Sequence, residues 1–160
     1  MKKNIILKLL ASVLILTAIA SCRKDPVIGG TAVQSLSGQW WVTTVGSDGS
    51  KSGYYELRTY NTSANLPTEM WIDDLNNYYG LHAKIAAQAS AQTFSANAAD
   101  ELYYGVKVTI TDGKVLNGVS KGPVSKAVTD SIYFKATFTG DATVYTYSGY
   151  KRTGFVKDDH

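Results

Sequence analysis

The stretch DSIYFKATF, residues 130–138, decides the fold class of this chain. Its apolar residues Ile132, Phe134, Ala136 and Phe138 alternate with more polar ones. Side chains along a β-strand point alternately to the two faces of a sheet. The alternation therefore predicts a strand with one buried face and one solvent-exposed face.

Similar segments lie on both sides of this stretch, separated by short polar turns. Among the turns, Asp112-Gly113 predicts a tight hairpin connection. A series of short strands needs its edges hidden, and closure into a barrel achieves this. We therefore expect one all-β domain over residues 36–160, an antiparallel up-and-down barrel of about eight strands. The further strands are expected around residues 40–45, 54–60, 69–72, 80–88, 92–97, 104–110, 115–119 and 143–149.

The N-terminus carries the pattern of an export signal. Lysines at positions 2, 3 and 8 accompany an apolar run that ends in Ala20-Ser21, followed by Cys22, the one cysteine of the chain. This run resembles a bacterial lipobox, which predicts a signal peptide over residues 1–21, a lipidated Cys22 and a flexible tether over residues 22–35. We then expect a protein anchored in the cell envelope, at the outer membrane of a Gram-negative cell. A plain secretory signal and an uncleaved membrane helix are the alternatives, although about 20 apolar residues are needed to span a bilayer.

The charge balance argues against nucleic-acid binding. Removing residues 1–21 removes three of the 16 Lys and Arg residues and none of the 13 Asp and Glu residues, so the remaining chain has no formal net charge. Nucleic-acid binders need a surplus of cations on one face.

Two levels of pattern resemble known families. Gly38-Gln39-Trp40 resembles the Gly-x-Trp of lipocalin-type (calycin) barrels, in which the tryptophan packs at the closed end beneath a late arginine, here Arg152. The wider pattern of lipobox, SGQWWV, LHAKIAAQ, DSIYFKATFTGD and YTYSGYKRTGF resembles small bacterial lipoproteins described as a lipid-binding putative hydrolase family. The resemblance implies a calycin-like barrel over residues 35–157 and suggests a lipid ligand.

A barrel of this size holds either side chains alone or one small ligand. We expect a small apolar or amphipathic, lipid-like ligand, bound without a cofactor, and aromatic residues at the cavity or its mouth. The alternative is a surface module that recognises glycans or proteins through exposed aromatic residues such as Trp71 and Tyr60. The candidate ligand-binding residues are Leu57, Trp71, Ile72, Phe94, Tyr104, Val106, Val108, Phe134 and Phe138.

Hydrolytic chemistry has little support in the residues. A serine triad needs a histidine base; we expect His82 on the outer face and His160 in a mobile terminus, and there is no Gly-x-Ser-x-Gly. A pair of carboxylates remains an alternative, and no metal site is expected, because the aspartates lack calcium-loop spacing. No catalytic residue is therefore assigned. The carboxylates weighed are Glu56, Glu69, Asp73, Asp74 and Glu101.

Overall fold

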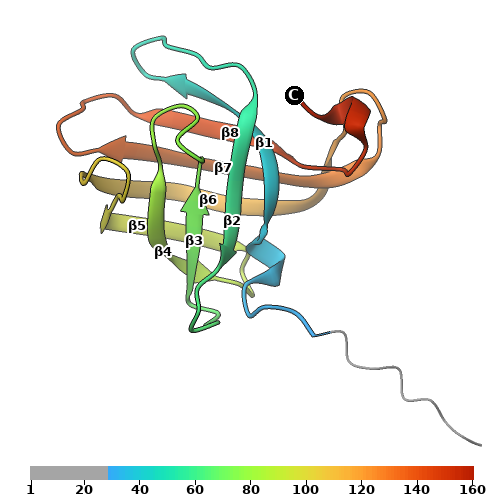
Figure 1. The fold of residues 1–160 in the computed structure, drawn as a ribbon, viewed down its shortest axis with the longest axis horizontal. Helices are drawn as coiled ribbons and strands as arrows, with labels where there is room; N and C mark the ends of the chain where they lie inside the picture. Colours follow the sequence, from blue (N-terminus) through green and yellow to red (C-terminus); the bar gives the residue numbers. More distant parts are fainter. Residues whose placement is uncertain (1–28) are drawn as a thin grey trace, which may run out of the picture.

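Eight antiparallel strands close into one barrel in the computed structural model, which describes residues 29–160 (Figure 1). Each strand pairs with the next in sequence, and β8 pairs with β1 to complete the ring. This confirms the predicted all-β, up-and-down barrel. The elements are η1 (Gln34–Leu36), β1 (Gly38–Gly46), β2 (Tyr55–Asn61), β3 (Glu69–Asp73), β4 (His82–Gln88), β5 (Thr93–Asp100), β6 (Lys107–Lys121), β7 (Val128–Phe138), β8 (Tyr145–Lys151) and η2 (Val156–Asp158).

The described residues supply all eight strands and the core that they enclose. The signal peptide predicted for residues 1–21, the lipidation site Cys22 and the tether up to residue 28 lie outside the described residues.

Alternation along β7 places its apolar side chains inside the barrel, as the sequence predicts. Ile132, Phe134, Ala136 and Phe138 are buried, and the residues between them are partly exposed. Phe134 lies opposite Tyr147 of β8, and their rings stack with centroids 4.3 Å apart. Full burial of such a side chain contributes about 1.5–3 kcal/mol, so β7 is held mainly by what it buries.

The Asp112-Gly113 pair forms a β-bulge and not the predicted hairpin turn. Three steps along β6, from Gly113 back to Ile110, match two steps along β5, and the register with β7 shifts at the same place. Such a count defines a bulge, which bends its strand. Asp112 adopts a positive φ of 57°, and a Cβ at position 113 would lie 2.6 Å from Cδ2 of Phe94. The pair therefore bends one strand of 15 residues, β6, where two strands were expected.

One end of the barrel is closed by η1. Val33 and Leu36 are fully buried, and the Leu36 carbonyl accepts a hydrogen bond from the Thr59 hydroxyl, which in turn accepts one from the Trp40 indole. The segment before Leu36 thus belongs to the packed barrel, and the domain begins earlier than the predicted boundary at residue 36.

The cation over Trp40 is Lys151 and not Arg152. The Lys151 Nζ lies 5.6 Å from the indole centroid, whereas the Arg152 guanidinium binds Asp159 and Gln39. Lys151 is the residue directly opposite Trp40 in the ladder between β1 and β8. Neighbouring residues of a strand point to opposite faces, so Arg152 cannot share that position.

The opposite end is covered by tyrosines from the loop of residues 75–80 and from β8. Tyr79 stacks on Phe138 with centroids 4.0 Å apart, and both Tyr79 and Tyr145 donate hydrogen bonds to the Asp141 carboxylate. Burial and this carboxylate raise the pKa of Tyr145 to about 12. The loop is held from below by Asp74, which is fully buried and accepts backbone N–H groups.

Candidate functional site

Most of the predicted ligand-lining residues form the packed core of the barrel. Side chains of the core pack against one another in the interior; for example, the centroids of the Phe94 and Phe134 rings lie 5.7 Å apart. Contact of any of these residues with a ligand stays a prediction. Fully or almost fully buried are Leu57, Ile72, Phe94, Val108, Phe134 and Phe138, and Val106 is partly buried against them.

Two of the aromatic candidates, Trp71 and Tyr104, lie outside the core. Trp71 is half-buried on the outer face of β3, with its ring 5.1 Å from that of His82. Tyr104 is 63% exposed in the loop after β5, and its hydroxyl donates to Asn76. The structure thus separates these two residues from the seven interior ones.

His82 faces outward, as the sequence predicts, and sits among tyrosines. Its Nε2 lies 3.3 Å from the Tyr60 hydroxyl, and the Tyr103 hydroxyl donates to Asp73 beside it. Within the described residues, no serine is hydrogen-bonded to His82. The predicted mobility of His160 is wrong, because its ring stacks on Tyr54 at 4.1 Å and its Nε2 lies 2.8 Å from the Tyr150 hydroxyl.

The buried carboxylates hold loops in place. Glu101 accepts backbone N–H groups of Tyr103 and Tyr104, and Asp73 accepts that of Leu75. Burial raises the pKa of Asp74, although the N–H groups that it accepts oppose this shift. These hydrogen bonds give the carboxylates a structural role in the loops.

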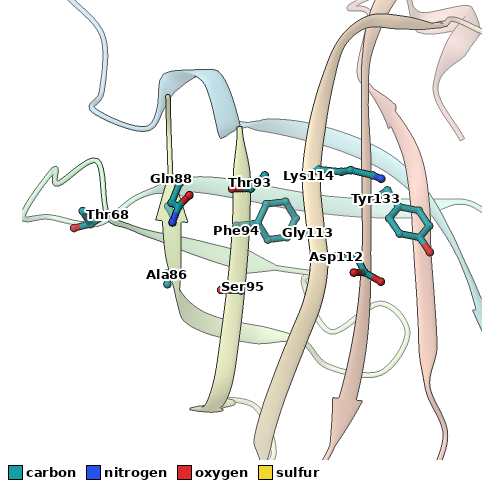
Figure 2. A pocket seen from close by; sticks show the side chains of 11 residues that line it. Thr68, Ala86, Gln88, Thr93, Phe94, Ser95, Asp112, Gly113, Lys114 and Tyr133 are labelled. Atoms are coloured by element: carbon teal, nitrogen blue, oxygen red, sulfur yellow. The ribbon is translucent and has the colours of Figure 1, made fainter. Parts of the chain in front are cut away.

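A groove of about 780 Å³ crosses the outer face of the barrel over β4 to β7 (Figure 2). In Figure 2 the Phe94 ring lies between β5 and β6, with Lys114 and Tyr133 beyond it. This volume falls within the range of small-molecule sites, about 300–1,000 Å³. We call four of its lining residues the floor: Ala86, which is exposed, Gly113, and the core residues Ala87 and Phe94, which are 3% and 4% exposed. The rim consists of Thr68, Gln88, Thr93, Ser95, Asp112, Lys114 and Tyr133.

The groove exists because β6 bends at its bulge. Bulges occur often beside binding sites, where they redirect side chains. Gly113 leaves the floor bare of a side chain at the bend, and the strand then presents Asp112 and Lys114 at the rim. The Asp112-Gly113 pair is the one signal of this site in the sequence, but the sequence pattern predicts a hairpin turn there.

Lys114 is the cation that the groove offers to a ligand. Asp112 is already paired with Lys135, with 2.9 Å between Nζ and Oδ2, and this hydrogen bond raises the pKa of Lys135. The ion pairs of the described residues include none with Lys114. Its Nζ lies 5.2 Å from the centre of the Tyr133 ring, whose face attracts a cation. An apolar floor thus lies beside an ammonium group that no carboxylate neutralises.

Under the tyrosine-rich end, the Tyr147 hydroxyl is fully buried, and no atom of residues 29–160 forms a hydrogen bond of good geometry with it, although the Tyr55 hydroxyl lies close by. The nearby Tyr55 hydroxyl is hydrogen-bonded to Thr44. Burial, followed by the charge of Tyr55, raises the pKa of Tyr147 well above its usual value. A buried hydroxyl without a hydrogen bond lowers the free energy of unfolding, and a substitution that removes the hydroxyl measures this effect.

No helix in residues 29–160 is both long enough and apolar enough to cross a bilayer. Across the same residues, no group of three or more His, Cys, Asp and Glu side chains is arranged to hold a metal ion.

Comparison with known proteins places the chain in a family. No curated protein sequence matches it. The family described as lipid-binding putative hydrolase matches residues 25–156, a range that includes every strand of the barrel and every residue that lines the groove. The match supports a lipid-binding role. The chain belongs to the family of lipid-binding putative hydrolases.

Proposed function

We propose that this protein is an envelope lipoprotein that binds a single-chain amphipathic lipid in its outer groove. The observation that carries the proposal is the groove itself, where an apolar floor adjoins the unpaired Lys114. An acyl chain that ends in an anionic headgroup complements both parts. The described core side chains pack together in the barrel interior, whereas the groove is an open space on the barrel surface.

The proposed location rests on the N-terminal sequence. Acylation of Cys22 would anchor the domain in the cell envelope, at the outer membrane, on its periplasmic or its cell-surface side. Several acyl chains, at about 0.8 kcal/mol per buried methylene, would hold it there stably. A lipid ligand is abundant at such a surface, and the family description supports this class of ligand.

The acyl chain supplies most of the binding free energy. Removal of roughly 200 Å² of chain surface from water contributes about 5 kcal/mol, at about 25 cal/mol per Å². A solvent-exposed ion pair contributes about 1 kcal/mol at most. The floor therefore sets the affinity, and Lys114 distinguishes an anionic headgroup from a neutral one.

Calorimetric titration of residues 23–160 with palmitate and with hexadecanol tests this division. We expect Lys114→Gln to weaken palmitate binding about threefold to fivefold and to leave hexadecanol binding unchanged. Lys107→Gln is the matched control, because it removes a lysine from the same strand away from the groove. Equal palmitate affinity for the two variants would contradict the role of Lys114.

A second pair of variants tests the floor. Ala86 is exposed on the groove floor, so Ala86→Asp places a carboxylate there without filling the core. We expect it to abolish the binding of both ligands. The control is Ala91→Asp, in the exposed turn between β4 and β5. Wild-type affinity of Ala86→Asp would overturn the assignment of the ligand to the groove.

A further inference from the structure

The ends of β6 and β7 project beyond the barrel and carry an apolar surface that no part of the described chain covers. Val119 and Val128 are 63% and 66% exposed, and Val156 of η2 is 83% exposed. In Figure 1 the hairpin that joins β6 to β7 lies beside η2 at one side of the molecule. We call this surface the β6–β7 tip; it consists of Val119, Val124, Val128, Phe155 and Val156.

Asp158 fixes the two parts of the tip to each other. Its carboxylate accepts hydrogen bonds from the backbone N–H groups of Val124 and Ser125 and from the Thr153 hydroxyl. Burial would raise the pKa of Asp158, but these hydrogen bonds and that of the Ser125 hydroxyl lower it overall. The valines of the hairpin and of η2 are thus presented by one fixed unit.

The exposed charges around the tip that have no ion-pair partner among the described residues are cationic. Lys121, Lys126 and Lys157 are exposed, and none of them forms an ion pair among the described residues. The carboxylates nearby are engaged: Asp158 as above, and Asp130 with Gly118 and Lys151. Exposed valines with nearby lysines that form no ion pair among the described residues are complementary to a bilayer surface with anionic headgroups.

We propose that the β6–β7 tip docks on the anionic surface of the membrane that anchors the chain. This inference rests on the proposed anchor at Cys22, because the eight residues from there to Gly30 span at most about 30 Å, which keeps the domain at the bilayer. The outer face of β6 also leads from the tip to the groove, since Leu116 is exposed two residues beyond Lys114. A lipid leaving the bilayer at the tip would meet the groove along the same strand.

Vesicle co-sedimentation of unlipidated residues 23–160 tests the docking surface directly. The vesicles contain phosphatidylcholine with or without phosphatidylglycerol. We expect binding to the anionic vesicles only. Because each lysine near such a surface contributes about fivefold in affinity, we expect roughly 100-fold weaker binding when Lys121, Lys126 and Lys157 are all replaced by Gln.

Matched variants separate this surface from general effects of charge or hydrophobicity. The charge control replaces three exposed lysines elsewhere. The apolar test replaces Val119, Val124 and Val156 by Ser, and its control replaces Val45, Leu66 and Leu102, which are also exposed. We expect both tip variants to lose vesicle binding and both controls to keep it. The lysines of the charge control are Lys51, Lys84 and Lys107.

Three results would overturn the proposal, and the first two are no binding of wild type to anionic vesicles and equal binding by tip variants and controls. A dimer in gel filtration that the valine variants dissociate, without vesicle binding, would also overturn it and assign the tip to a second copy. Palmitate titration of the same variants is independent of the tip. Tip variants that bind palmitate normally but no longer bind vesicles support docking. A wild-type protein that does not bind palmitate contradicts the groove proposal alone.

Discussion

Replacement of Tyr147 by Phe should stabilise this protein. The Tyr147 ring is fully buried and stacks on Phe134, but within residues 29–160 its hydroxyl forms no hydrogen bond of good geometry. The folded state therefore bears the cost of removing that hydroxyl from water, about 1–3 kcal/mol. Phe keeps the ring and its stacking and removes the cost. We expect the free energy of unfolding to rise by about 1–2 kcal/mol.

Urea unfolding followed by tryptophan fluorescence measures this change, and calorimetry measures the shift in Tm. For a domain of this size, each kcal/mol raises Tm by about 4 °C. Tyr145→Phe is the matched control two residues away on β8, where the hydroxyl donates to Asp141 at 2.7 Å. The control should lower stability, so the two variants should move in opposite directions. A Tyr147→Phe variant less stable than wild type would show that the hydroxyl has a partner and refute the reasoning.

Three further perturbations test other parts of the account. Gly113→Ala should cost about 1–3 kcal/mol by overpacking against Phe94, measured by urea unfolding, whereas Gly53→Ala, with nothing within 4 Å of the new Cβ, should not. The N–H of Thr143 and the Tyr145 hydroxyl lower the pKa of Asp141 to about 2 in the folded state. Its stabilising effect is therefore present above the unfolded value of 3.8 and is lost as the pH falls through about 2. In Asp141→Asn, the free energy of unfolding should depend less on pH in that window. Lys151→Met should shift the NMR signal of the Trp40 indole N–H more than Arg152→Met does, and the reverse order would restore the arginine assignment.

The strands could be predicted because their signal is local. In β4 and β7, each buried apolar residue is followed by a more exposed one, and a period of two is a direct consequence of strand geometry. The same rule placed His82 on the outer face. Closure followed from the number of strands, because open edges are a liability in an all-β chain.

The bulge and the cation over Trp40 depend on pairing between distant segments. Asp112-Gly113 provides the positive φ that a hairpin turn uses, but β6 continues because both its halves pair with β7. Lys151 and Arg152 are chemically similar neighbours, and the register of β8 against β1 alone selects which one faces the indole. His160 is likewise held by rings that come from remote parts of the sequence.

The groove was missed for the same reason. Its residues run from Thr68 to Tyr133, come from several strands and include few types that mark a binding site. Small residues such as Ala86 acquire a role only when the bent β6 places them beside Lys114 and Tyr133. The predicted interior residues pack in the core, and their contact with a ligand stays a prediction.

The central claim is that the lipid lies in the outer groove and not in the barrel interior. Paramagnetic broadening of NMR signals by a nitroxide-labelled stearic acid bound to residues 23–160 tests it most directly. We expect the label to broaden the amide signals of Ser95, Lys114 and Tyr133 and to leave the methyl signals of Leu57 and Ile72 sharp. Broadened Leu57 and Ile72 methyl signals with sharp groove amides would place the lipid inside the barrel and contradict the account.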